Sequence, residues 1–355
     1  MPSRERPPQP RRHYRAAVAQ VLRFLSARSP KVRTRQNQTI APLYISQSKI
    51  LAALAAAGFA LPVHAATSVL LPSMECAPAG AVFVDDFDSD SMVPHDPSNG
   101  SGGGYPGSRT RTLHIAGLGS GTQNYYVYLP SDYTPTRSWP MLLALHGVAP
   151  SGDSYARSTR DSWVGAAKSG QFIVVAPVAD DVFQCWDGSK YVACESWLMP
   201  PAQPSDLDLF AAVLADMESA YNIERTRIYG WGFSAGAHVM DLLGVTDVSD
   251  AFNASTMAAY SVSSGVLQGW VCPGPTDAGC ASLLANLPRK IPVDIHIGTT
   301  DPNYFEAAAD HSLFVAEGWT DNQTIHYTEF DGGHTYTIAQ LTEIWNNLCP
   351  NAVVP

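Results

Sequence analysis

A serine framed by two glycines is the part of the chain most suited to chemistry. Gly232, Ser234 and Gly236 form a Gly-x-Ser-x-Gly motif between a strand-like segment, residues 227–230, and a helix-like segment, residues 237–243. A serine at a sharp strand-to-helix turn is a nucleophile elbow, in which the glycines leave room for neighbouring backbone. Ser234 is therefore the predicted nucleophile. An ordinary Gly/Ser turn has the same composition, so the rest of the chain must distinguish the two.

A buried strand upstream supplies a second part that such an elbow needs. Residues 140–145 form a continuous apolar run, typical of a strand buried on both faces of a parallel sheet, and His146, Gly147 and Val148 follow it. Backbone N–H groups after this strand, together with that of Ala235, would stabilise the charge that develops on an attacked carbonyl oxygen. We expect Gly147, Val148 and Ala235 to form this oxyanion hole.

An acid and a base follow the motif in sequence. Asp301 lies just beyond a buried apolar segment, residues 291–297, and His334 follows an alternating segment and a Gly-Gly pair. Nucleophile, acid and base thus occur in the order Ser, Asp, His, which is the order in α/β-hydrolases. We expect Asp301 to orient the base His334, with Asp331 as the alternative acid.

These segments resemble a known group of enzymes. Residues 139–147, 232–236, 298–302 and 332–336 are similar to motifs of secreted polyhydroxybutyrate depolymerases and feruloyl esterases, and the similarity spans about residues 110–349. The resemblance implies an α/β-hydrolase fold. Such a fold has a mostly parallel sheet with helices on both faces, and here we expect an antiparallel N-terminal edge.

The resemblance also implies a serine esterase that uses no cofactor and no metal. Ser234 would attack an ester carbonyl, His334 would pass the proton to the leaving alcohol, and Asp301 would hold the imidazole; water would then release the acyl group. The implied substrates are small or oligomeric esters, either hydroxyalkanoate oligomers or feruloyl-type esters. A peptidase with the same residues is the alternative, and a non-catalytic binding protein is a further one. Ala237 stands where many members of the group have glycine.

Other apolar segments predict the surrounding elements. Residues 112–115 and 125–129 indicate an antiparallel pair at the sheet edge, and residues 172–177 indicate a buried strand. Apolar positions at helical spacing predict a helix over 206–221. The segment 181–203 between them is rich in aromatic residues and prolines, so it either lines the acyl pocket or covers the core. The expected pocket residues are His146, Trp186, Trp197, Phe233 and Tyr336.

Composition and charge limit the partners. The chain has 355 residues, of which 45% are hydrophobic and 15% charged, enough to bury one large core. Residues 1–65 hold 11 Lys and Arg and one acid, which leaves 11 basic and 31 acidic residues, a charge near −20, for 66–355. This charge argues against nucleic acid or an anionic membrane surface as a partner.

The N-terminal third predicts an exported protein. Residues 1–48 form a basic leader, and residues 49–65 resemble a signal peptide, with an apolar run too short to span a bilayer and small residues for cleavage after Ala65. Residues 66–109 are acidic and then glycine-rich, typical of a flexible linker. The catalytic domain would occupy 110–355. We therefore expect an extracellular or periplasmic protein without stable membrane insertion.

All six cysteines follow the expected cleavage site, and an even number in an exported protein indicates disulfides. Although six cysteines permit 15 pairings, proximity in sequence favours two pairs and leaves a third: Cys185–Cys194, Cys272–Cys280 and Cys76–Cys349. Metal binding is the alternative, but the spacing lacks a zinc-like Cys-x-x-Cys.

Overall fold

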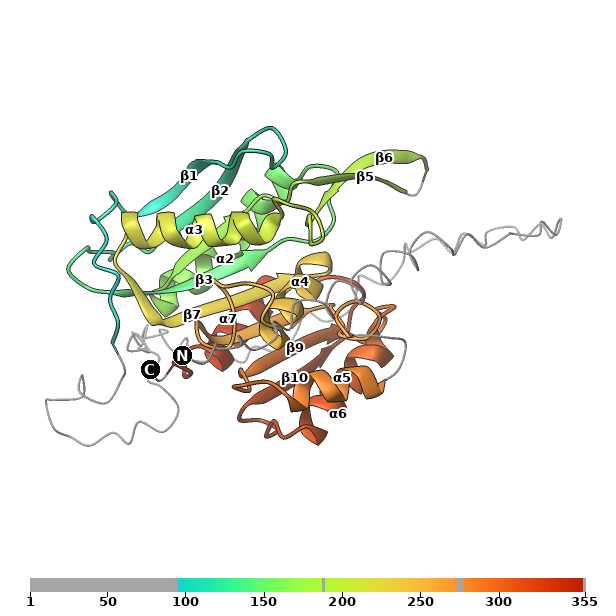
Figure 1. The fold of residues 1–355 in the computed structure, drawn as a ribbon. Coiled ribbons are helices and arrows are strands. Elements are labelled where there is room, and N and C mark those ends of the chain that lie inside the picture. Colours follow the sequence, from blue (N-terminus) through green and yellow to red (C-terminus); the bar gives the residue numbers. More distant parts are fainter. Residues whose placement is uncertain (1–94, 187–188, 273–276, 354–355) are drawn as a thin grey trace, which may run out of the picture.

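The computed structural model describes residues 95–186, 189–272 and 277–353 (Figure 1). The predicted leader and signal peptide, most of the predicted linker segment, and Cys76 lie outside these residues. In chain order, the elements are β1 (Gly107–His114), β2 (Thr122–Leu129), β3 (Trp139–Leu145), α2 (Gly152–Gly170), β4 (Ile173–Pro177), β5 (Asp181–Trp186), β6 (Tyr191–Ser196), α3 (Asp206–Ala220), β7 (Ile223–Phe233), α4 (Ala235–Val245), β8 (Met257–Ser263), α5 (Asp277–Ala285), β9 (Val293–Gly298), α6 (Tyr304–Ala316), β10 (Ile325–Phe330) and α7 (Ile338–Leu348).

An eight-stranded sheet with the order β1-β2-β4-β3-β7-β8-β9-β10 organises the described chain. From β4 through β3, β7, β8 and β9 to β10, each strand is parallel to the next. At the N-terminal edge, β1 pairs antiparallel with β2, and β2 pairs antiparallel with β4. The predicted mostly parallel sheet with an antiparallel edge is confirmed.

Helices cover both faces of the sheet, as predicted. One face carries α3, α4, α5 and α6 over the larger apolar core. The other face carries α2 and α7, where Trp163 packs against Trp231 and Phe172 stacks on Trp345. Every residue of β3 and of β8 is buried, because a central parallel strand has no solvent-facing side; this explains the continuous apolar sequence of β3.

Local signals in the sequence match the helix boundaries. Helix α3 begins after Ser205, whose N–H donates to the Asp208 carboxylate at 2.7 Å in a capping box. The predicted helix over 206–221 is thus confirmed to within a residue. The segment after β4 forms a hairpin of β5 and β6 that projects from the sheet (Figure 1).

Two of the predicted disulfides are present in the described chain. One, between Cys185 and Cys194, cross-links β5 to β6. The other, between Cys272 and Cys280, ties the end of the loop after β8 to helix α5. Both therefore fasten segments that extend beyond the carboxyl ends of the sheet strands. Within the described residues, no helix combines the length and the apolar character needed to cross a bilayer.

The glycine-rich segment 99–104 is packed rather than free, which corrects the prediction of a flexible linker. The N–H of Ser101 donates to the carbonyl of Ser219 at 2.9 Å. A Cβ on Gly100 would lie 2.2 Å from the Tyr221 carbonyl oxygen, and one on Gly103 would lie 2.2 Å from that of Ala220. These glycines therefore permit close approach to the end of α3. Strand β1 also begins earlier than predicted.

Candidate active site

The predicted elbow is a sharp turn between β7 and α4. Ser234 has φ 55° and ψ −117°, a backbone conformation that non-glycine residues rarely adopt outside functional sites. A Cβ on Gly232 would lie 2.1 Å from the Gly236 carbonyl oxygen, and one on Gly236 would lie 2.3 Å from that of Leu145. Only glycine fits at either position, so the motif meets the steric requirement that distinguishes an elbow from an ordinary turn.

The three residues predicted to act together lie in one hydrogen-bonded chain. Nε2 of His334 lies 2.8 Å from Oγ of Ser234, and Nδ1 of His334 lies 3.0 Å from Oδ2 of Asp301. Asp301 is buried, and its other carboxylate oxygen accepts the N–H of Asn303 at 2.8 Å. With a proton on Nδ1 facing the carboxylate, Nε2 can accept the serine proton. Asp331, the alternative acid, is exposed.

The strand ends explain why these residues meet. The carboxyl ends of neighbouring parallel strands lie at one edge of a sheet, and β7, β9 and β10 end at Phe233, Gly298 and Phe330. The loops after β9 and β10 are joined, because the N–H of Thr300 donates to the carbonyl of Gly332 at 2.9 Å. A Cβ on Gly298 would lie 2.4 Å from that same oxygen. The two loops therefore position acid and base as one unit.

The loop after β3 lies against the elbow. A Cβ on Gly147 would lie 3.1 Å from Cβ of Ser234. Nδ1 of His146 donates to the Gly147 carbonyl at 2.7 Å, while Nε2 accepts the N–H of Ala179 at 3.2 Å. In a trans peptide, C=O and the following N–H point in opposite directions. The N–H of Val148 therefore points away from the imidazole.

Two N–H groups next to the serine remain available to a substrate. Among the described residues, neither Val148 nor Ala235 donates its N–H to a backbone or side-chain acceptor. Ala235 is the first residue of α4, where N–H groups have no partner within the helix. Burial lowers the pKa of His146 to about 4, so its ring stays neutral at physiological pH and keeps the hydrogen bonds that orient the Gly147 peptide.

The predicted pocket residues take different places. Phe233 and Tyr336 are partly buried with their ring centroids 5.1 Å apart, and the Phe233 ring lies 5.2 Å from that of His334. His146 and Trp197, in contrast, are buried, and the Trp197 indole donates to the His146 carbonyl at 2.9 Å. These two residues support the loop from beneath instead of lining a pocket, because their polar atoms are used within the core.

Trp186, the remaining predicted pocket residue, ends strand β5, where its backbone pairs with Tyr191. The described part of the chain has no group of three or more His, Cys, Asp or Glu side chains placed to hold a metal ion.

Sequence reasoning missed an aromatic pair beside the elbow. The indole of Trp270 is 48% exposed and stacks on the imidazole of His238, with ring centroids 4.3 Å apart. His238 follows Ser234 by one helical turn, so the two share a face of α4. Burial, with a smaller contribution from the charge of His334, lowers the pKa of His238 to about 4. Trp270 therefore has a neutral support close to the nucleophile.

Most exposed large apolar side chains of the described residues lie in segments that follow the carboxyl ends of the sheet strands; Tyr105 and Val315 are the exceptions. Trp270 follows β8, Phe305 follows β9 and Ile338 follows β10. The further members, after β3 and β4, are Val148, Tyr155, Val182, Phe183 and Tyr191. Loops at this edge shape ligand sites in α/β folds, and the elbow with Ser234 lies at the same edge.

Comparison with known proteins identifies the fold. No protein-family model matches the chain. A bifunctional acetylxylan esterase/xylanase of Neocallimastix patriciarum is 29% identical over 116 residues, which are 32% of this chain and 14% of that protein, so the chain spans only a small part of this relative.

Solved structures match over a larger share of the chain. A ferulic acid esterase superposes with a TM-score of 0.51 and 15% identity, covering 70% of this chain and 98% of that one. A feruloyl esterase module from Clostridium thermocellum has a TM-score of 0.49 and 16% identity, covering 73% and 93%. Together with the sheet order and the strand-to-helix elbow, the first of these similarities shows that the chain has the α/β-hydrolase fold.

Proposed function

We propose that the protein is a serine esterase that hydrolyses carboxylic esters through Ser234, His334 and Asp301. The observation that carries the proposal is the continuous hydrogen-bonded chain from the Asp301 carboxylate through both nitrogens of His334 to the Ser234 hydroxyl, with contacts of 3.0 and 2.8 Å. This arrangement gives the imidazole one nitrogen that is oriented and one that is free to take the serine proton.

The first half of the reaction forms an acyl-enzyme. Oγ of Ser234 attacks the ester carbonyl while Nε2 of His334 takes the hydroxyl proton. The carbonyl oxygen becomes negative, and the N–H groups of Ala235 and Val148 stabilise it; one such donor typically contributes about 3–4 kcal/mol to lowering the barrier. His334 then gives its proton to the leaving alcohol, and the carbon–oxygen ester bond breaks.

The second half releases the acid. Nε2 of His334 takes a proton from water, whose oxygen attacks the acyl carbonyl, and the proton returns to Oγ of Ser234 as the bond to serine breaks. Asp301 keeps its negative charge throughout and stabilises the imidazolium that forms twice in each cycle. The Asp301 carboxylate is suited to this role because it is buried and also accepts a hydrogen bond from the N–H of Asn303, which holds it in place.

The substrate class we propose is an ester of a plant-wall polysaccharide with a short or aromatic acyl group. The matched relative is named as an acetylxylan esterase/xylanase, and the superposed structure as a ferulic acid esterase. Phe233, Tyr336 and Trp270 supply aromatic surface around the nucleophile. Hydroxyalkanoate oligomers remain the other expected ester class, because the same apolar surroundings suit them.

We also propose that the protein is exported. Disulfides persist in oxidising compartments, and the two disulfides of the described chain support such a location. The predicted signal peptide over 49–65 is consistent with it.

A substrate panel tests the proposed function. Purified protein is assayed on nitrophenyl acetate, methyl ferulate, acetylated xylan, hydroxybutyrate oligomers and peptide nitroanilides, alongside Ser234→Ala and the exposed control Ser312→Ala. We expect ester hydrolysis in the wild type and in Ser312→Ala, and a loss of at least about 10³-fold in Ser234→Ala. Cleavage of the amides in preference to all esters would identify a peptidase instead. Ester hydrolysis that survives Ser234→Ala would overturn the assignment of the nucleophile.

A further inference from the structure

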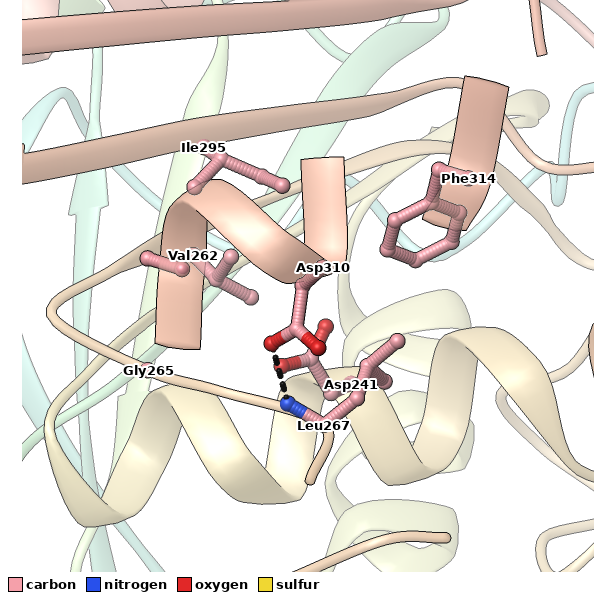
Figure 2. Close-up of a pocket in the computed structure, with 8 residues that line it drawn as sticks. Asp241, Val262, Gly265, Leu267, Ile295, Asp310 and Phe314 are labelled. Carbon is pink, nitrogen blue, oxygen red and sulfur yellow. Dashed lines mark hydrogen bonds between the residues drawn. The ribbon is translucent and has the colours of Figure 1, made fainter. Parts of the chain in front are cut away.

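A small enclosed space lies behind the nucleophile helix, between α4, α6 and strands β8 and β9. Its lining is apolar except for two carboxyl groups, those of Asp241 on α4 and Asp310 on α6 (Figure 2). The side chains of both aspartates are 2% exposed. Figure 2 shows the two carboxyl groups reaching into the same space. Neither group contacts the proposed catalytic residues, so the mechanism above leaves them without a role.

Three segments that shape the proposed active site meet at this space. Helix α4 starts at the nucleophile, and Asp241 lies seven residues, two helical turns, after Ser234. Helix α6 starts at Tyr304, shortly after the acid Asp301. The third segment is the loop over 264–272, which carries Trp270.

Asp310 joins α6 to this loop. Its Oδ2 accepts the N–H of Leu267 at 2.7 Å, the bond drawn in Figure 2. The loop in turn lies against the first turn of α4, because a Cβ on Gly265 would lie 2.4 Å from Cβ of Ala237. Just before the loop, the carbonyl of Ser263 accepts the N–H of Ser234 at 3.0 Å. A shift at the carboxyl pair would therefore be passed to the backbone of the nucleophile.

The surroundings of Asp241 favour a retained proton on its carboxyl group. Among the described residues, no Lys, Arg or His forms an ion pair with Asp241, and its Oδ1 has no hydrogen-bond partner. Burial, and then the charge of Asp310, raise the pKa of Asp241 well above its ordinary value. Two adjacent carboxylates in an apolar space cannot both ionise without a large cost in free energy.

The other described residues that line the space are uncharged, and the nearby titratable groups on α4 and β8 carry no positive charge. Tyr260 on β8 is fully buried, and burial followed by the charges of both aspartates raises the pKa of its hydroxyl well above the ordinary value. From β9, Ile295 lines the space. The loop over 264–272 contains no charged residue. On α4, His238 is neutral at physiological pH because its pKa is lowered.

We propose that Asp241 and Asp310 form a proton-sharing carboxyl pair that holds α4, α6 and the loop over 264–272 together and thereby positions Ser234. The shared proton lets one carboxyl group donate to the other, while Asp310 accepts from Leu267. Loss of that proton would place two negative charges in the apolar space and separate the three segments. The positioning part of the proposal rests on Ser234 being the nucleophile, whereas the shared proton does not.

The shared proton is tested first without reference to activity. Infrared spectra of the wild type at neutral and mildly alkaline pH should contain the carbonyl band of a protonated carboxyl group. The band should be missing or shifted in Asp241→Asn and in Asp310→Asn, and unchanged in Asp247→Asn, a control with an exposed carboxyl group. Absence of a protonated-carboxyl band from the wild type above neutral pH would overturn the proposal, even if no variant folds.

Thermal unfolding tests the direction in which stability changes with pH. A raised pKa means that the folded chain holds a proton that the unfolded chain has released, so the wild type loses stability as pH rises above the ordinary Asp value of about 3.9. The Asp241→Asn variant does not lose stability in this way, because its amide does not titrate. Its Tm relative to the wild type should therefore increase with pH, while the difference for Asp247→Asn stays constant. An equal Tm difference at every pH would contradict a shared proton.

The positioning role is read from kinetics. At the higher pH where the wild type loses its protonated-carboxyl band, Asp241→Asn should keep a larger fraction of its neutral-pH kcat than the wild type, because its amide cannot ionise. Asp241→Ala should lower kcat more than it changes KM, and the asparagine variant should restore most of that loss. If the infrared and thermal results hold but kcat has the same pH dependence in the wild type and Asp241→Asn, the pair does not position Ser234. If Ser234→Ala is fully active, the proposed function fails instead.

Discussion

At the scale of single residues, hydrogen-bond partners separate the proposed base from the structural histidines. His334 has a carboxylate at Nδ1 and a hydroxyl at Nε2, so a proton can enter and leave at Nε2. His146 donates from Nδ1 to a carbonyl and accepts an N–H at Nε2, and both contacts are buried. Protonation of His146 would break one of them. Among the histidines that the structure describes, only His334 therefore combines a reactive partner with an orienting acid.

The orienting acid gives a prediction with an internal control. Asp301→Asn should lower kcat by about 10⁴-fold, because an amide at Oδ2 favours the wrong imidazole tautomer. The kcat of Asp331→Asn should lie within about threefold of the wild-type value, since Asp331 is exposed. Steady-state kinetics on one nitrophenyl ester measures both. A larger loss of kcat in Asp331→Asn than in Asp301→Asn would show that Asp331 is the orienting acid.

Single residues differ in how far the sequence could predict them. Ser234, Asp301 and His334 each follow a recognisable strand, so their order and spacing placed them at one sheet edge. Trp270 lies in a loop without a motif, and its contact with His238 depends on the tertiary path of the chain. The sequence also could not show that His146 and Trp197 are buried, because aromatic residues in a loop suit a pocket and a core equally well.

At the scale of elements, the elbow depends on glycines that no other residue can replace. Gly236→Ala would place a Cβ 2.3 Å from the Leu145 carbonyl oxygen, which forces α4 away from β3. We expect this variant to lose most ester hydrolysis and to unfold at a lower temperature.

Gly165→Ala is the matched control for this variant. Gly165 is an exposed position within α2, where a Cβ meets nothing within 4 Å. The Gly165→Ala variant should unfold at the same temperature as the wild type or a higher one, since alanine is more favourable than glycine in a helix by about 0.5–1 kcal/mol. Circular dichroism melting and an ester assay compare the two. Equal behaviour of both variants would show that the elbow tolerates a side chain.

Elements were predicted best where one physical signal dominated. Buried parallel strands such as β3 have continuous apolar sequences, and α3 has both a periodic face and a capping box. The segment 99–104 was mispredicted because glycines that permit close backbone approach have the same composition as glycines that confer flexibility. Only the neighbouring carbonyls of α3 distinguish the two cases.

At the scale of the whole molecule, a buried neutral histidine makes the free energy of unfolding depend on pH. The pKa of His146 is about 4 in the folded chain, below the ordinary value of about 6.5. Between these values the unfolded chain binds a proton that the folded chain does not. The free energy of unfolding should thus fall by up to about 1.4 kcal/mol per pH unit from this residue as pH drops from about 6.5 to about 4.

Urea unfolding at a series of pH values measures this dependence. His146→Asn should be less stable than the wild type at neutral pH, yet lose less stability on acidification, because asparagine does not titrate. His114→Asn alters an exposed histidine and should keep the wild-type slope. If His146→Asn and the wild type lose stability in parallel, the buried imidazole is not the source.

We propose above that Ser234 is a nucleophile activated by His334. The most direct measurement treats the native protein with a fluorophosphonate and locates the adduct by peptide mass spectrometry. We expect one phosphonyl group per chain on Ser234, formed far more slowly in His334→Ala and at the wild-type rate in His114→Asn. Labelling at another residue, or no labelling of correctly folded protein, would contradict it.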